Sequence, residues 1–192
     1  GVRLRIEIFA CRERPGLGLG FALDSSEPLE LEVSFRADLR PMWPAGLGGQ
    51  LVRRDAVTGA FVLTEELGRW AVAVGAIGSR VEFEAPERGL PSGLVRVFVP
   101  LEAGGSSTVL AIAAAEVPPD PLAAVGARGD GLEVARACIE RAIVTTRELW
   151  FRLVSDFSEE REIAHVHWRA HQARVLAIET PYPALDQAFQ WA

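Results

Sequence analysis

The sequence predicts a mainly β protein, in which an antiparallel β-sandwich is followed by C-terminal connecting helices and no βαβ unit occurs. Three observations lead to this prediction. Apolar and polar residues alternate with a period of two through much of residues 1–118. Gly, Pro and Ser, rather than helices, separate the alternating stretches. The period becomes helical after a Pro- and Gly-rich segment, EVPPDPLAAVGARGDG. We therefore expect a sandwich domain over residues 1–118 and a helical linker over residues 119–192.

Seven or eight strands are expected in the first unit. The clearest are VRLRIEIF and LELEVSFR, where every second residue is apolar. In the first of these, the apolar face consists of Val2, Leu4, Ile6 and Ile8. Two short strands are expected around a turn near Thr58 and Gly59. The remaining strands lie in RWAVAVGAIG, RVEFEAP, GLVRVFVP and TVLAIAAAEV, and Trp70 at the start of one of them is expected in the core.

Helices are expected in the last third of the chain. The first has an apolar stripe with alternating spacings of four and three, made of Ala135, Ile139, Ala142, Thr146, Leu149 and Leu153. A second helix is expected to begin near Ser158, with acidic residues in its first turn. Its expected stripe is Ile163, Val166, Ala170, Ala173 and Ala177. A third is expected to begin after Thr180 and to be still unfinished at Ala192.

Charge and composition narrow the possible partners. The net charge is −6 and the isoelectric point is about 5.2, whereas nucleic acid and anionic membranes both require a basic patch, so we expect neither as a partner. No apolar run approaches the roughly 20 residues that a membrane span needs. Cys11 and Cys138 are too few for a disulfide framework, and we expect two buried reduced thiols and a cytoplasmic address.

A loop rich in Pro and Gly supplies the candidate binding residues. The stretch RPMWPAGLGG presents Trp43, whose flat indole can stack on the apolar face of a pyranose. Asp38 and Arg40 lie nearby and are candidates to hydrogen-bond sugar hydroxyls. In the alternative interpretation Trp43 closes the end of the sandwich, and Asp38 and Arg40 pair in solvent, which contributes at most about 1 kcal/mol.

Other motifs are interpreted as structural. GLGLG and GLGG resemble parts of a dinucleotide-binding pattern, but no helix follows them in a βαβ unit. His167 and His171 are four residues apart and share a helical face, but no third ligand is evident, so no metal site is expected. The simpler interpretation is that these residues and His165 border the sandwich. No cofactor is expected.

Two stretches resemble the bacterial glycogen-debranching, or amylo-α-1,6-glucosidase-like, glycoside hydrolases. The first is ETPYPALDQAFQWA, which resembles the segment that opens the first helix of that family's (α/α)₆ barrel. The second is VSFRADLRPMWPAGLGG, in which Ala37, Asp38, Leu39 and Trp43 occupy comparable places. The matching positions of the first stretch are Thr180, Pro181, Pro183, Leu185, Asp186, Ala188, Phe189, Trp191 and Ala192.

The resemblance implies that this chain is a non-catalytic N-terminal module. The family's barrel carries a general acid and a general base for inverting hydrolysis, and we expect both to lie beyond Ala192. The partners would be that barrel and an α-glucan or oligosaccharide. The barrel contact would be made by Leu185, Ala188, Phe189 and Trp191. The alternatives are a freestanding carbohydrate-binding sandwich and a small enzyme complete in itself.

Overall fold

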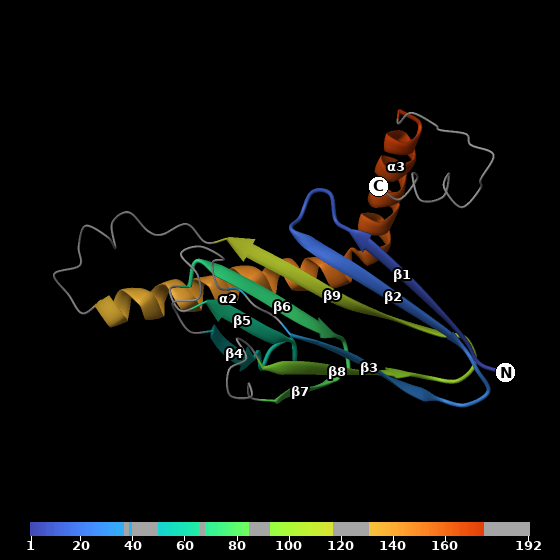
Figure 1. Ribbon diagram of the computed structural model, residues 1–192, viewed down its shortest axis with the longest axis horizontal. Coiled ribbons are helices and arrows are strands. Elements are labelled where there is room, and N and C mark those ends of the chain that lie inside the picture. Colours follow the sequence, from blue (N-terminus) through green and yellow to red (C-terminus); the bar gives the residue numbers. More distant parts are fainter. Residues whose placement is uncertain (37–38, 40–49, 66–67, 85–92, 117–130, 175–192) are drawn as a thin grey trace, which may run out of the picture.

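The structure is a computed structural model that describes residues 1–36, 39, 50–65, 68–84, 93–116 and 131–174. Two antiparallel sheets pack together and two C-terminal helices follow, which confirms the predicted fold class (Figure 1). The strands end at Glu116 and the first described helix begins at Gly131. The division into units at residue 118 stays a prediction.

The larger sheet has six strands in the order β1-β2-β9-β6-β5-β4, and the smaller has the order β3-β8-β7. Every pair is antiparallel. The bounds of the first five strands are β1 Arg3–Ala10, β2 Gly16–Asp24, β3 Leu29–Arg36, β4 Gln50–Arg54 and β5 Phe61–Glu65. The others are β6 Trp70–Ala76, β7 Arg80–Glu84, β8 Leu94–Leu101 and β9 Ser106–Glu116. The helices are α2, Gly131–Ser155, and α3, Phe157–Gln172.

The main core lies between the two sheets. On β8, Val95, Val97 and Val99 are 0% exposed, while the residues between them face outward. They pack against large apolar side chains of the six-stranded sheet, including Leu63 and Leu110. The period-two pattern of the sequence thus buries one face of each sheet, as predicted.

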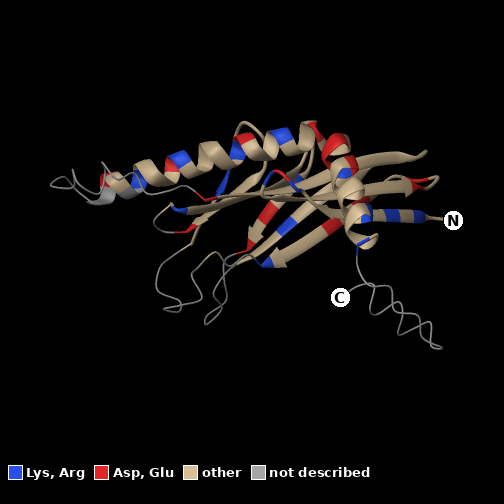
Figure 2. Ribbon diagram, turned by 90° about the horizontal axis from the view of Figure 1, so that it is seen from above, with Lys and Arg blue, Asp and Glu red and all other residues tan. Residues whose placement is uncertain are grey.

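The helix α2 covers the other face of the six-stranded sheet and forms a third layer (Figure 2). Ala73, Ala111 and Ala113 line that face and leave room for the helix. Trp150 is 2% exposed, and its Nε1–H donates to the carbonyl oxygen of Ala111 at 3.0 Å. The predicted stripe is confirmed for its described side chains, because Ala142, Thr146 and Leu153 are buried and Ile139 and Leu149 are half-buried.

The strand β2, which contains GLGLG, is not among the strands predicted from the sequence. Glycine disfavours strands, but Gly18 here faces two aromatic rings from neighbouring elements. A Cβ on Gly18 would lie 2.6 Å from Cζ of Phe9 and 2.9 Å from Cε2 of Phe157. The glycines therefore allow α3 and β1 to approach this strand closely.

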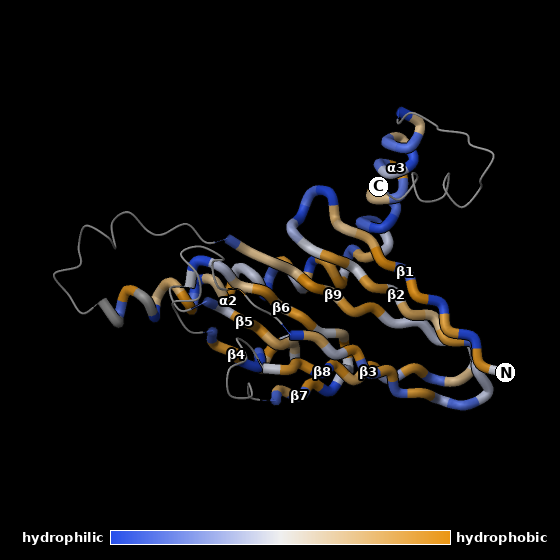
Figure 3. Tube along the Cα trace, in the orientation of Figure 1, coloured by the Kyte–Doolittle hydropathy of each residue, from blue (hydrophilic) through white to orange (hydrophobic). Residues whose placement is uncertain are grey.

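The expected burial of the first strand is wrong, although its alternation is right (Figure 3). Leu4, Ile6 and Ile8 are 39%, 52% and 62% exposed. Pairing of Ile6 with Phe21 places them on the face of the inter-sheet core, but the smaller sheet ends at β3 and does not cover them.

The expected apolar stripe of the second helix is also not buried. α3 begins at Phe157, one residue before the predicted Ser158, and contacts the sandwich through its first turns, where Phe157 and Glu160 are buried. Further along, Ile163 is half-buried, and Val166 is 56% exposed. The helix projects away from the sheets, so its later turns have no described surface to cover them (Figure 1).

Candidate functional site

The loop predicted to bind sugar joins the two sheets at one end of the sandwich. Asp38, Arg40 and Trp43 lie outside the described residues, so their predicted role stays untested. Leu39, within the same loop, packs against the inter-sheet core, and its main-chain N–H donates to Oε1 of Gln50 at 3.0 Å. Leu39 therefore connects the chain after β3 both to the start of β4 and to the core.

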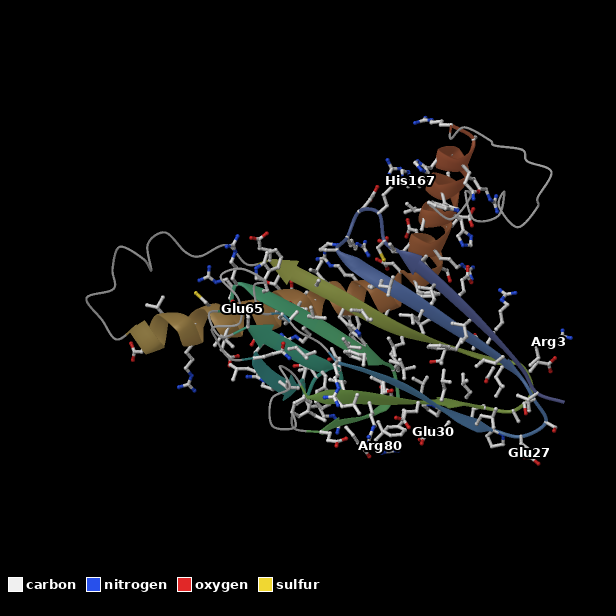
Figure 4. All side chains as sticks on the ribbon, viewed as in Figure 1. Arg3, Glu27, Glu30, Glu65, Arg80 and His167 are labelled. Carbon is white, nitrogen blue, oxygen red and sulfur yellow. The ribbon has the colours of Figure 1, made fainter. Side chains whose placement is uncertain are left out.

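Several strand ends meet at this end of the sandwich, which we call the loop-bearing end and define by Gln50, Glu65, Trp70 and Glu116. Gln50 starts β4 opposite Glu65 at the end of β5. Trp70 starts β6 opposite Glu116 at the end of β9. In Figure 4, Glu65 lies at this end and Arg3 at the opposite end. The topology thus brings an aromatic side chain and two carboxylates to the rim from which the predicted loop leaves.

Trp70 is half-exposed, which corrects the expectation that it lies in the core. Its side chain is 40% exposed, because it occupies the first position of β6 at the rim, whereas Val74 further along the strand is 0% exposed. The guanidinium carbon of Arg69 lies 5.6 Å from the centre of the indole ring. Nε and Nη2 of Arg69 donate to Oε1 of Glu116 at 3.0 and 2.7 Å. An aromatic face and a charged pair therefore stand side by side.

The turn before Trp70 is held by a buried carboxylate and by α2. Glu65 is 8% exposed, and its Oε1 accepts from the main-chain N–H groups of Arg69 and, at 3.4 Å, Trp70. Gly68 has a φ of +69°, and a Cβ there would lie 2.5 Å from the nitrogen of Ile139 on α2. Only glycine combines this backbone conformation with so close an approach. The position of Trp70 is thus fixed by the fold.

The chemistry of these groups suits contact with a sugar ring. An indole face matches the apolar C–H face of a pyranose ring, and the guanidinium and carboxylate beside it can hydrogen-bond hydroxyls. The pair of Arg69 and Glu116 is about half-exposed, with side chains 58% and 44% accessible. An ion pair so exposed contributes little to folding stability. The exposure of Trp70 could not be predicted, because a strand-initial tryptophan gives no signal of which end of the strand lies at the rim.

A second polar cluster lies where α2 meets α3. Nη1 of Arg14 lies 2.8 Å from Oδ2 of Asp156 and 3.2 Å from Oε1 of Glu160. Glu160 is 3% exposed, and its Oε2 has no hydrogen-bond partner among the described residues. Burial and then the charge of Glu160 raise the pKa of the Cys11 thiol to about 11, although Arg14 opposes this. Cys11 is therefore protonated at neutral pH and is a poor nucleophile.

Of the three histidines, His165 borders the sandwich as the simpler interpretation expected, whereas His167 and His171 are exposed on the later turns of α3. Nε2 of His165 lies 3.0 Å from Oε1 of Glu7 on β1, and Arg161 lies 3.6 Å from the other oxygen. His171 stacks on Trp168 with ring centres 5.7 Å apart. In the part of the chain that the structure describes, no three His, Cys, Asp or Glu side chains gather to hold a metal ion. Cys11 and Cys138 are free and half-buried rather than fully buried.

The predicted contact with a catalytic barrel lies outside the described residues. This applies to Leu185, Ala188, Phe189 and Trp191. The helices before them expose apolar side chains, namely Val144 at 39%, Phe151 at 59%, Val166 at 56% and Trp168 at 53%.

Neither a protein-family model nor a curated protein sequence matches this chain. Within the described ranges, no helix has both the length and the apolar character that crossing a bilayer requires.

Proposed function

We propose that this chain is a non-catalytic β-sandwich module of a glycogen-debranching-like glycoside hydrolase, which supports the catalytic barrel. The observation that carries this proposal is the course of α3, which leaves the sandwich with Val166 56% exposed and with Ala170, one turn later on the same helical face, also exposed. Neighbouring apolar side chains on a projecting helix are typical of a surface that another element covers. The resemblance of residues 179–192 to the segment that opens the barrel's first helix supports the barrel as that element.

The coding DNA beyond codon 192 tests this proposal. The expected result is an open reading frame of several hundred codons that encodes repeated helical hairpins and two acidic residues suited to inverting hydrolysis. A stop codon close to codon 192, or a following region unrelated to a helical barrel, would exclude the module assignment.

A second candidate function is carbohydrate binding by the sandwich itself, and the exposure of Trp70 favours it. In this candidate the indole of Trp70 stacks on an α-glucan ring, with Arg69 and Glu116 beside it and the predicted Trp43, Asp38 and Arg40 on the adjoining loop. Binding would be weak in an isolated module, because one stacked aromatic supplies only about 1 kcal/mol beyond the area it buries.

Isothermal titration with maltoheptaose separates the two functions. Trp70→Ala is compared with Trp168→Ala, since both indoles are substantially exposed, at 40% and 53%, and lie on different elements. Glucan binding that Trp70→Ala abolishes and Trp168→Ala leaves unchanged supports the carbohydrate-binding function. Flat heats with the unsubstituted chain, or equal losses in both variants, exclude it and leave only the supporting role.

A further inference from the structure

The six-stranded sheet extends beyond the smaller sheet at its β1 edge (Figure 1). We call Leu4, Ile6 and Ile8, which are 39%, 52% and 62% exposed, the open strip. Leu4 pairs with Leu23 and Ile6 with Phe21, both of which are buried in the inter-sheet core. The open strip therefore belongs to the core face of the sheet, and nothing in the described part of the chain covers it.

The strand next to this opening, β3, has a free edge. Among the described strands it pairs only with β8. Its inward side chains Leu31, Val33 and Phe35 are only half-buried and Leu29 is 42% exposed, although each lies opposite a buried residue of β8. A free strand edge presents main-chain donors and acceptors that another strand can pair with. The inter-sheet core is thus fully covered beneath β8 and partly exposed to solvent beside β3.

The outer face beside this edge carries an excess of carboxylates. Two arginines each contact two glutamates across the three strands. One set is Arg80 with Glu30 and Glu82, and the other is Arg96 with Glu32 and Glu84. Glu30 on β3 lies 3.2 Å from Arg80 (Figure 4). Glu32, also on β3, lies 3.4 Å from Arg96. Arg36 stands on the same face of β3, so the described outer face has four carboxylates and three guanidinium groups, and this excess of one carboxylate favours cationic neighbours.

We propose that the β3 edge and the open strip together bind one extended polypeptide strand. Such a strand would pair with β3, place apolar side chains over the open strip at every second position and present basic side chains beside Glu30 and Glu32. A strand is the expected occupant because it can pair with the free edge of β3 and lie over the open strip at the same time. The occupant is thus an alternating apolar and basic β segment from outside residues 1–192.

A single strand fits this opening better than a second copy of the chain. Edge-to-edge pairing of two copies through β3 would bring both protruding β1 edges into the same space, because the larger sheet of each copy extends past its β3. One added strand lies about 4.8 Å beyond β3, over the uncovered part of the larger sheet, and meets no such obstacle.

A fluorescein-labelled peptide of eight residues, alternating Val and Lys, tests the proposal in fluorescence anisotropy titrations. Two control peptides are used, one with the same composition in two blocks and one with Glu in place of Lys. We expect saturable binding of the Val–Lys peptide and at least about tenfold weaker binding of both controls, since the first loses the alternation and the second the charge match. Equal binding of the block peptide would overturn the strand geometry.

Variants of the chain locate the binding. The double variant Ile6→Arg and Ile8→Arg is compared with Val57→Arg and Ile77→Arg, which replace turn residues that are 76% and 68% exposed. All four positions are exposed, so folding should persist, as checked by far-UV circular dichroism. We expect the open-strip variant to lose at least about tenfold in peptide affinity and the control to keep it.

Hydrogen exchange supplies an independent readout. We expect the peptide to slow the exchange of main-chain amides in β3 of the unsubstituted chain, because the free edge gains hydrogen-bond partners. Binding without protection of β3, or unchanged binding by the open-strip variant, would overturn the proposal. Light scattering tests whether the chain forms a dimer. A dimer that is lost in the open-strip variant and unaffected by the peptide would assign the open strip to a second copy and would also overturn the proposal.

Discussion

The substitution Gly18→Ala should destabilise the fold by about 1–2 kcal/mol. Gly18 faces Phe9 and Phe157, which are 7% and 8% exposed and pack on each other with ring centres 5.0 Å apart. The added methyl group would lie 2.6 Å from Cζ of Phe9, well inside van der Waals contact. Overpacking of this kind typically costs 1–3 kcal/mol, while the loss of backbone freedom in the unfolded chain offsets roughly 0.4–1 kcal/mol.

The matched control is Gly20→Ala on the same strand and the same face. A Cβ on Gly20 would lie 3.3 Å from Cζ of Phe157, so the ring needs to move by only a few tenths of an ångström. We expect its free energy of unfolding to stay within about 0.5 kcal/mol of the original chain. Urea unfolding, followed by the fluorescence of the tryptophans, measures both variants, provided that the slope with urea is unchanged.

A double variant checks the cause of the difference. Phe157→Leu removes one of the two rings that crowd Gly18 and gives the other, Phe9, room to move, so Gly18→Ala should cost less in that background, with a coupling energy of at least about 0.5 kcal/mol. Equal destabilisation by Gly18→Ala and Gly20→Ala would refute the reasoning, because the two differ mainly in their distance from these rings. Strict additivity in the double variant would refute it as well.

Three further predictions concern buried polar contacts. Trp150→Phe keeps most of the apolar surface but removes the indole N–H that donates to Ala111, so urea unfolding should show a loss of about 1–3 kcal/mol. The pKa of Cys11 rises from 9.0 to about 11 on folding, so the stability that its protonated thiol contributes is complete below pH 9 and is lost between pH 9 and 11. The urea midpoint of the unsubstituted chain should therefore fall over this pH range, and Cys11→Ala should reduce that fall. Glu160→Gln removes a charge that raises this pKa, so iodoacetamide should alkylate Cys11 faster at pH 8 in the variant; an unchanged pH–rate profile would contradict that assignment.

The fold class could be predicted from alternation along single strands, because each strand of a sandwich has one buried face and therefore carries the alternating pattern in its own sequence. β8 is the clearest case, since Val95, Val97 and Val99 alternate with outward residues and are 0% exposed. The burial of β1 could not be predicted in the same way. Leu4, Ile6 and Ile8 have the same pattern, but their exposure depends on how far the opposite sheet extends, which is a property of strand order.

The candidate site was less accessible to sequence reasoning. The exposure of Trp70 depends on its place at the rim and on a turn held by Glu65 and Gly68, contacts that join residues to α2 and to one another across the sheet. The strand β2 was not predicted from its glycine-rich sequence for a related reason. Gly18 reads as a strand breaker until Phe157, 139 positions later in the chain, is known to lie against it.

The two faces of the six-stranded sheet require different covers, and this difference connects the glycines of β2 with the open strip of β1. On the helix side, small residues such as Gly18 and Ala111 let α2 and α3 lie close to the sheet, so that face is covered by elements that follow it in the chain. On the other side, large residues require an opposite sheet, and three strands cannot span six. Leu4, Ile6 and Ile8 lie beyond the edge strand β3, so a strand that pairs with β3 would lie over them. The apolar face of β1 therefore calls for a strand beside β3, and the peptide titration tests that requirement directly.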